Sequence, residues 1–419
     1  MAGLFLFPAS AGAQDDSGFT GTITVTDGEG EKTPAEGIRF FVEDAGSLVG
    51  EGVTDADGVF FIPVPAGTYS IAVDIDSIPE GITLRNPDRP QLDDLDINDG
   101  QSRNVLFPLL GEGVVSTVGA GGDGLATRAL RLAIDGIIFG LIIAMCSIGL
   151  SLIFGTTGLT NFAHGELVTV GALGALLFNS TGGFGIHIVL AAILAVLLAA
   201  AAGGVNEKFL WRPLRRRGTG LIAMLVISIG LSILGRYVLL YLAGGNRQKY
   251  EQFGTQTPFE IGPVSMVPRD LWIIGLSVVT LVLVALAVQR TKTGKAMRAV
   301  ADNRDLAESS GIDVDRVILT VWVIGGGLAG FGGVLFGLNQ GIRWDMGFEL
   351  LLLMFAAVTL GGLGTAYGPL FGSLIVGLFI NLSTLVVPPE VKNVGALLIL
   401  VVILLVRPQG LFGQRERIG

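Results

Sequence analysis

The chain of 419 residues combines 50% hydrophobic residues with only 15% charged residues, a mean hydropathy of +0.67 and a net charge of −9. The charge content is far below the roughly 25% that is usual in soluble domains, which excludes an ordinary soluble protein and indicates an integral membrane protein. Residues 1–128 hold 21 acidic against 6 basic residues, whereas the remainder has a net charge of +6, so the overall acidity says nothing about nucleic-acid binding.

Residues 1–13 contain an apolar stretch that ends in the small residues Ala11 and Ala13, a pattern typical of a secretory signal peptide. No Lys or Arg precedes this stretch. A true start elsewhere, or a segment of another kind, therefore stays open as an alternative.

Residues 14–110 show strand-like alternation in short runs, with turn residues between them at roughly ten-residue spacing, which predicts a small β-sandwich. The run TDADGVFFIPVPAGTYSIAV, residues 54–73, resembles carboxypeptidase-regulatory-like (transthyretin-like) domains. The resemblance implies a turn at Asp57-Gly58 and a strand opening at Ala66–Tyr69, and it implies a fold rather than an activity. A Gly-rich linker is expected over 111–131.

Residues 132–413 are predicted to form the membrane domain, followed by a short tail, 414–419. Nine apolar stretches occur here, and most approach the about 20 residues that a spanning helix needs. The stretch 349–364 is short and interrupted by Gly, so we expect it and its neighbour to be half-helices or a re-entrant pair. The fold class is thus a polytopic α-helical membrane protein with about eight or nine spanning or partly spanning helices, preceded by a small all-β sandwich. The stretches are 133–155, 161–179, 186–206, 219–242, 271–289, 317–338, 349–364, 369–387 and 391–406.

The distribution of Lys and Arg predicts the orientation in the membrane. Alternating spans place the connections 207–218, 290–316 and 407–419 on one side with 14 basic residues, against six on the other side. By the positive-inside rule the first side is cytoplasmic, and an odd number of crossings then puts the N-terminal domain outside. The expected location is a prokaryotic plasma membrane, with the C-terminus in the cytoplasm.

Polar residues at membrane depth are candidates for a translocation path. Asn161, His164, Gly165 and Glu166 lie between the first two spans, and Arg236 lies inside the fourth. A charged group at membrane depth costs roughly 2.5–3.5 kcal/mol, so Glu166 is expected to face protein or water. Residues 158–166 form either a broken-helix element of the passage or a plain polar turn near an aqueous boundary. Asp135, Arg236 and Glu349 each belong either to an outer-gate ion pair or to the membrane interface. His164 and Glu166 do not share a helical face, which argues against a proton relay between them.

Two segments resemble nucleotide-binding motifs, but neither meets the requirements of one. The segment around Gly294-Lys295 lacks the first Gly and the final Ser or Thr of a phosphate-binding loop, because Gln289 and Ala296 stand there. The run 325–330 fits a dinucleotide fingerprint but lies inside a span, where small residues one turn apart let helices pack closely. Cys146 is the single cysteine. We therefore expect no catalytic residues, no ATP site, no cofactor and no metal.

Two polar segments on the basic side stand out. Residues 211–217, WRPLRRR, favour either a topological anchor or a site for a partner or lipid headgroups. The loop 290–316 contains basic residues, an Ala-rich helical stretch and a Gly break. It resembles the loop through which an ABC permease contacts its ATPase.

Five ordered blocks resemble one family, the permease subunit of branched-chain amino-acid ABC importers of the LivH type. The resemblance covers 132–413, and urea and short-amide permeases look similar. The blocks are 161–166, 212–214, 294–299 with Asn303, Ala307 and Gly311, 361–364, and 407–413.

The resemblance implies a half-channel that pairs with a second permease, two cytoplasmic ATPases and an external solute-binding protein. Residues 294–311 would be the coupling segment, in which Gly294 permits a turn, Arg298 contacts the ATPase, and Ala307 and Gly311 keep the helix slim. The remaining residues of this predicted segment are Lys295, Ala296 and Asn303. Family members usually begin near the first span, so the added acidic domain leaves open whether the binding protein docks in the usual way; it could guide that protein, bind the cell envelope or act as a spacer.

Three alternatives stay open. A stand-alone secondary transporter or channel predicts an inverted repeat and paired intramembrane charges. A urea or short-amide ABC permease differs only in substrate. A sensor or adhesion protein would place its activity in the outer domain.

Overall fold

The computed structural model describes most of the chain, in two compact units, Met1–Gly124 and Leu125–Gly419, which are treated separately. The predicted signal peptide, most of the predicted linker, nearly all of the ninth apolar stretch and the tail lie outside the described residues. The described residues are 17–26, 32–44, 47–79, 81–84, 90–97, 102–111, 125–253, 258–261, 264–362, 364, 367–387 and 401.

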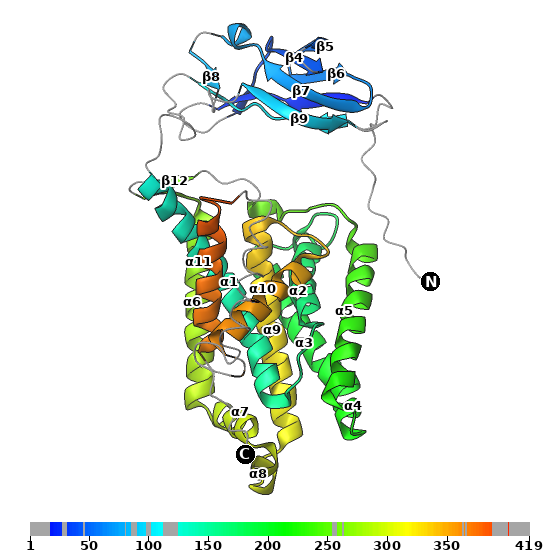
Figure 1. Cartoon of the computed structure of the whole chain (residues 1–419), viewed down its shortest axis with the longest axis vertical. Helices are drawn as coiled ribbons and strands as arrows, with labels where there is room; N and C mark the ends of the chain where they lie inside the picture. The colour runs from blue at the N-terminus through cyan, green and yellow to red at the C-terminus, as the bar shows by residue number, and fades with distance from the viewer. Residues whose placement is uncertain are drawn as a thin grey trace. The chain divides into compact units, whose positions relative to one another are not determined.

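The N-terminal unit is an all-β domain, as predicted (Figure 1). One sheet has the strand order β10-β1-β6, a second has β5-β4-β7-β9, and a smaller one has β3-β2-β11-β8. Most neighbours are antiparallel, but β1 pairs in parallel with β10, and β11 pairs in parallel with β2. The strands are β1 (Gly18–Thr22), β2 (Thr24–Thr26), β3 (Lys32–Pro34), β4 (Arg39–Asp44), β5 (Ser47–Val53), β6 (Val59–Pro63), β7 (Gly67–Val73), β8 (Thr83–Leu84), β9 (Gln91–Ile97), β10 (Ser102–Asn104) and β11 (Leu109–Leu110).

Alternating burial makes this unit a sandwich. In β6, Phe60 and Ile62 point inward while their neighbours are exposed, as period-two alternation requires. Phe60 stacks on Phe40 of the facing sheet, with ring centroids 4.3 Å apart. The predicted turn is present, since Gly58 has a φ of 72° that suits glycine. The unit therefore has a hydrophobic core of its own.

The second unit is a helical bundle (Figure 1). Five of the described helices are long and apolar enough to cross a membrane, and α10 and α11 are shorter apolar helices. A two-stranded hairpin, β12 (Phe259–Ile261) and β13 (Val264–Met266), precedes α6. The helices are α1 (Leu125–Thr157), α2 (His164–Asn179), α3 (Ile188–Asn206), α4 (Arg212–Arg216), α5 (Leu221–Ala243), α6 (Pro268–Arg290), α7 (Lys292–Asp302), α8 (Arg304–Ser309), α9 (Val314–Gln340), α10 (Met346–Gly361) and α11 (Gly368–Ser383).

Two boundaries differ from the expectations. α1 begins at Leu125, so the segment 125–131, expected as linker, is helical; it is rich in Ala, Leu and Arg, which favour helix. The expected polar connection 207–218 begins as a continuation of α3, because a π-helical turn over Glu207–Trp211 leads directly into α4. The basic run is therefore the end of one long helix.

α2, α10 and α11 each have 16 residues, about 24 Å at the helical rise of 1.5 Å per residue. That length is short of a hydrocarbon core of about 30 Å. The lengths of α10 and α11 agree with the expectation of partly spanning helices.

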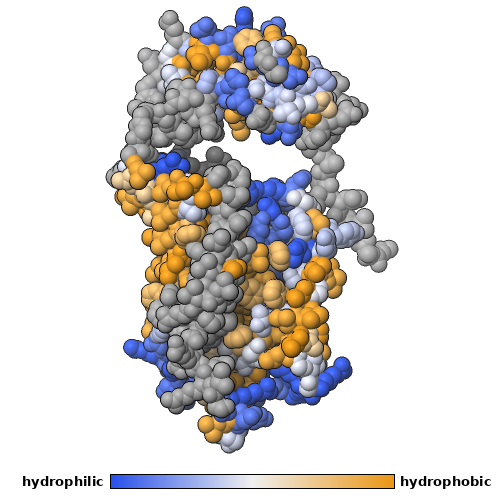
Figure 2. Space-filling view, viewed as in Figure 1, coloured by the Kyte–Doolittle hydropathy of each residue, from blue (hydrophilic) through white to orange (hydrophobic). Residues whose placement is uncertain are grey.

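Burial separates the inner from the outer helices. α1 and α9 are mostly buried, whereas α5 and α6 expose most of their apolar side chains. Figure 2 shows a broad hydrophobic surface over the helical unit, with hydrophilic residues at its lower end, where Figure 1 places α4, α7 and α8. This pattern suits a bundle that is solvated by lipid around its sides and by water at its end.

Candidate functional site

The predicted coupling segment is a pair of short helices, α7 and α8. The Thr291 hydroxyl accepts a hydrogen bond from the Gly294 amide at 3.0 Å and caps α7. The Asn303 side chain accepts one from the Leu306 amide at 2.9 Å and caps α8. Each cap satisfies an amide that the first helical turn leaves without a partner. Gly311, with a φ of 84°, follows α8 and turns the chain toward α9.

One face of this segment is seated in the bundle. Met297, Val300 and Ala307 are buried in a cluster with the indoles of Trp211 and Trp322, whose ring centroids lie 6.0 Å apart. Ala307 is small where α8 meets this cluster, so it faces the bundle, and its expected role toward the ATPase stays a prediction. α7 and α8 are therefore packed elements and not a loose loop.

Gly294 lies in the first turn of α7, directly after the turn at Thr291 that separates it from α6, and its expected role in permitting that turn stays a prediction. A Cβ at this position would lie 2.3 Å from the Val288 carbonyl oxygen and 2.4 Å from that of Ala287. Glycine is needed because the backbone of α7 passes against the end of α6. The first turn of α7 and the last turn of α6 therefore lie backbone against backbone.

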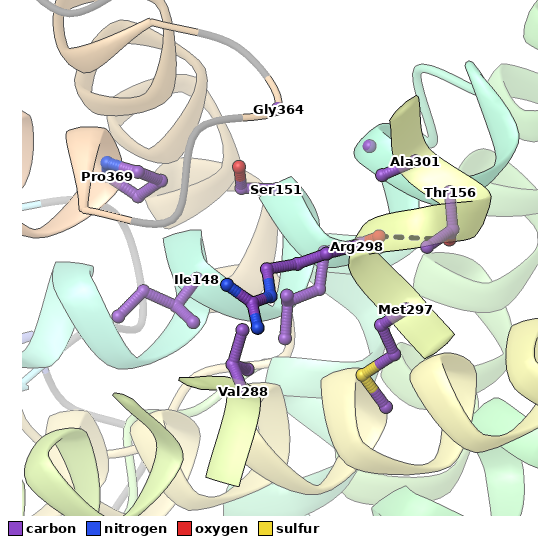
Figure 3. A pocket seen from close by; sticks show the side chains of 11 residues that line it. Ile148, Ser151, Thr156, Val288, Met297, Arg298, Ala301, Gly364 and Pro369 are labelled. Carbon is purple, nitrogen blue, oxygen red and sulfur yellow. Dashed lines mark hydrogen bonds between the residues drawn. The ribbon is translucent and has the colours of Figure 1, made fainter. Parts of the chain in front are cut away.

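The opposite face of the segment is exposed and polar. Lys295, Arg298 and Asn303 are exposed, and Ala296 is half-buried between the two faces. The Arg298 guanidinium also donates a hydrogen bond to the Gln289 carbonyl at 3.3 Å. Arg298 lines a small cavity of about 60 Å³ together with residues of α1, α6 and α7 and with Gly364 and Pro369. Figure 3 shows the Arg298 side chain extending from α7 among these residues. Arg298 thus lies at the border between the exposed face of α7 and this cavity.

Ion pairs fasten the basic run beside this segment. Asp315, in the first turn of α9, accepts from Arg212 at 2.7 Å and from Arg216 at 2.8 Å. The buried Glu207 pairs with Arg215. Sequence reasoning missed these partners, because an acidic residue in the first turn of a helix is already favoured by the helix dipole and does not by itself indicate a basic partner.

A second constellation lies among the membrane helices; we call Glu166, Ser232, Arg236 and Phe348 the polar cluster. Ser232 of α5 donates a hydrogen bond of 3.0 Å to Glu166 Oε1 on α2. Arg236, one turn further along α5, holds its Nε 3.9 Å from the same oxygen. Its guanidinium carbon lies 3.8 Å from the ring centroid of Phe348 on α10, a cation–π contact. Two predicted path residues, Glu166 and Arg236, therefore meet.

The other predicted path residues have different neighbours. The Asn161 side-chain oxygen accepts from the Ala163 amide at 3.1 Å, and His164 Nε2 lies 3.1 Å from the Cys146 carbonyl of α1. At Gly165 a Cβ would lie 2.5 Å from the Gly347 carbonyl, so α2 and α10 touch backbone to backbone. These residues hold the start of α2 in place behind Glu166.

Sequence reasoning missed Ser232 and Phe348. The signal for Ser232 was present, since Ser228, Ser232 and Arg236 recur every four residues on α5 and so share one face. Phe348 carried no such signal, because its contact with Arg236 depends on the position of α10.

The turn between α9 and α10 is also fixed by charge. Arg343 donates to Asp345 at 2.5 Å and to Glu349 at 3.0 Å. The hydrogen bond to Asp345 raises the pKa of the Arg343 guanidinium above its usual value. Glu349 is therefore in an ion pair. Among the described residues, no group of three or more His, Cys, Asp or Glu side chains could hold a metal ion.

The profile of one protein family, described as branched-chain amino acid transport system / permease component, matches residues 132–406. The chain belongs to this family. The match contains both the polar cluster and the α7–α8 segment. Membership makes the helical unit a permease and not an enzyme, in a multi-pass membrane protein, and it does not favour a stand-alone secondary transporter or channel.

Curated relatives agree with this family. The permease protein LivH of the high-affinity branched-chain amino acid transport system of Salmonella typhimurium is 30% identical over 301 residues, covering 68% of this chain and 96% of LivH. BraD of Pseudomonas aeruginosa is 30% identical over 299 residues, covering 68% of this chain and 96% of BraD. LivM of Salmonella typhimurium is 27% identical over 308 residues, covering 67% of this chain and 70% of LivM. No solved structure matches the chain.

Proposed function

We propose that this chain is the transmembrane permease subunit of an ABC importer for branched-chain amino acids, driven by ATP hydrolysis on partner subunits. The observation that carries the proposal is the family match over the helical unit, together with LivH and BraD relatives whose names state this substrate. The similarity to LivM as well as to LivH supports a second, homologous permease as partner. Two cytoplasmic ATPases and an extracytoplasmic solute-binding protein complete the assembly.

The proposed orientation places α4, α7 and α8 in the cytoplasm and the β domain outside, in a prokaryotic plasma membrane. It is supported by the 14 basic residues on that side against six on the other. In this orientation the exposed face of α7 and α8 meets an ATPase.

The mechanism we propose is mechanical coupling. ATP binding and hydrolysis change which permease state the ATPases bind best, and that differential affinity shifts the permease pair between outward-open and inward-open states. α7 conveys the shift because its backbone touches the end of α6 and its side chains share a core with α9. Amino acid then crosses between the two permeases, past the start of α2.

The test is uptake of labelled leucine, urea and a short amide into proteoliposomes that contain the complete importer. We expect leucine uptake that requires ATP, the ATPases and the binding protein. Leucine uptake by this chain alone without ATP would overturn the proposal, and uptake of urea but not leucine would reassign the substrate.

A charge reversal tests the coupling face. Arg298→Glu places a carboxylate on the exposed side of α7, which faces the ATPase in the proposed assembly. The substitution also removes the hydrogen bond that Arg298 donates to the Gln289 carbonyl. We expect transport and substrate-stimulated ATP hydrolysis to fall together by roughly tenfold, a coupling loss of about 1–2 kcal/mol. Lys208→Glu, an exposed basic position at the same end but outside the run 211–217, serves as the control. Unchanged coupling in Arg298→Glu removes this residue from the mechanism.

A further inference from the structure

In the polar cluster the acidic Glu166 and the basic Arg236 lie close together, but at a distance longer than a hydrogen bond. The Glu166–Arg236 distance of 3.9 Å exceeds a hydrogen bond, whereas a structural Arg–carboxylate pair usually closes to about 2.7–2.9 Å. Among the described residues, Glu166 Oε2 and Arg236 Nε have no hydrogen-bond partner although both atoms are buried. A buried charged group without a hydrogen-bond partner costs free energy among membrane helices. The two unpartnered atoms therefore point to a ligand that forms hydrogen bonds with them.

The cluster also lies at the seam between α5 and α2, which borders the exposed surface of α5. The buried residues of α5 are Met224, Ser228 and Ser232, which recur every four residues, while most of its other apolar side chains are exposed. Of these, Ser228 accepts from the Phe162 amide and Ser232 donates to Glu166, at the start of α2. The Arg236 side chain is 18% exposed and the Glu166 side chain is 10% exposed. The pair therefore borders the surface of α5 and α2. A small solute that moves along this seam would meet both charges.

Aromatic rings line the same region. Phe348 lies under the Arg236 guanidinium, and Phe355, two turns further along α10, packs against Phe162 with ring centroids 4.9 Å apart. The Phe162 amide in turn donates to Ser228 of α5 at 3.1 Å. A polar stripe on α5 and an aromatic stripe on α10 therefore converge on the start of α2.

The chemistry of the two stripes fits one class of solute. A guanidinium binds a carboxylate through a planar fork of donors, and a carboxylate oxygen accepts from an ammonium group. In an α-amino acid the ammonium and carboxylate groups are attached to one carbon, so an acid and a base a few ångströms apart can hold both. Aromatic rings suit an aliphatic side chain, while urea and short amides carry neither charge.

We propose that Glu166 and Arg236 bind the ammonium and carboxylate groups of an α-amino acid during its passage, and that Phe348 and Phe355 contact its aliphatic side chain. This inference rests on the proposed function and assigns its substrate class to particular residues. Ser232 is a positioning residue, since its hydrogen bond directs Glu166 Oε1 and leaves Oε2 for the ligand.

The test separates passage of the solute from engagement of the ATPases. In proteoliposomes with the complete importer, leucine uptake and the ATP hydrolysis stimulated by leucine-loaded binding protein are measured side by side. For Glu166→Gln and for Arg236→Gln we expect stimulated hydrolysis to persist, while leucine taken up per ATP falls by roughly tenfold or more, the effect of losing one charged hydrogen-bond partner. Ser277→Ala, a buried serine of α6 outside the cluster, is the matched control and should leave the ratio unchanged.

A charge exchange distinguishes a ligand site from a structural ion pair. In Glu166→Arg combined with Arg236→Glu, a purely structural pair would re-form and restore uptake, which would overturn the proposal. We expect no restoration, because the ligand's groups then meet like charges. An unchanged ratio of leucine to ATP in both single variants would also overturn it.

Two safeguards keep the outcome decisive. Where a glutamine variant fails to insert, Glu166→Asp and Arg236→Lys replace it, and each is expected to lower uptake per ATP while retaining its charge. Absence of leucine uptake in the unmodified importer refutes the proposed function, whereas normal uptake with unaffected variants refutes only this site.

Discussion

At the scale of single residues, glycine sets how closely the helices of the bundle approach. A Cβ on Gly333 would lie 2.0 Å from the Val168 carbonyl oxygen, and one on Gly372 would lie 2.0 Å from that of Ala357. These contacts confirm the prediction that small residues one turn apart bring backbones together. By contrast, Gly230 of α5 and Gly275 of α6 face open space, on two helices that are largely exposed.

Gly294→Val tests whether close approach also matters for coupling. The valine side chain would collide with the backbone at the end of α6. Side-chain motion cannot relieve a clash with backbone atoms, so α7 must move away from α6. We expect insertion to persist and ATP-driven uptake to fall by roughly tenfold, a coupling loss of about 1–2 kcal/mol. Gly275→Val on the open face of α6 is the control. Equal uptake in the two variants would show that transport does not require the close packing of α7 against α6.

At the scale of elements, hydropathy predicts the helices well and their connections poorly. The expected spans 219–242 and 317–338 correspond to α5 and α9, because a long apolar run in lipid has no stable alternative to a helix. The helical course of 207–216 was missed, since basic residues mark a membrane boundary but do not end a helix. The meeting of Glu166 with Arg236 was missed as well, because it depends on how α2 and α5 pack.

The junction of α4 with α9 gives a prediction at this scale. Asp315→Asn removes the carboxylate shared by Arg212 and Arg216, both of which are partly exposed, so the loss should be modest at about 0.5–1 kcal/mol. We expect the melting temperature of the detergent-solubilised protein to fall by a few degrees, about 2–4 °C per kcal/mol in larger domains. Asp305→Asn, on the exposed surface of α8, should leave it unchanged. A decrease that vanishes in high salt would support an electrostatic cause, and no decrease would show that the junction is held by packing alone.

At the scale of the whole molecule, the two units have separate hydrophobic cores. Phe19, Phe40 and Ile62 belong to the core of the β domain, and the bundle has its own clusters. The change in hydrophobic periodicity and in charge along the sequence predicted this division. The role of the β domain could not be predicted, because its motifs indicate a fold and not an activity. A part with its own core can be removed without exposing the core of the other.

Deletion of residues 14–124 tests what the β domain contributes. Because the family match begins at residue 132, the remaining chain keeps every helix of the permease. We expect the truncated chain to insert in the same orientation and to import leucine, with protease protection of α7 and α8 in intact cells as the check on orientation. If uptake depends on the domain only when the binding protein is scarce, the domain guides that protein to the permease. If uptake disappears at saturating binding protein although insertion is normal, transport requires the β domain itself, and the two units act as one.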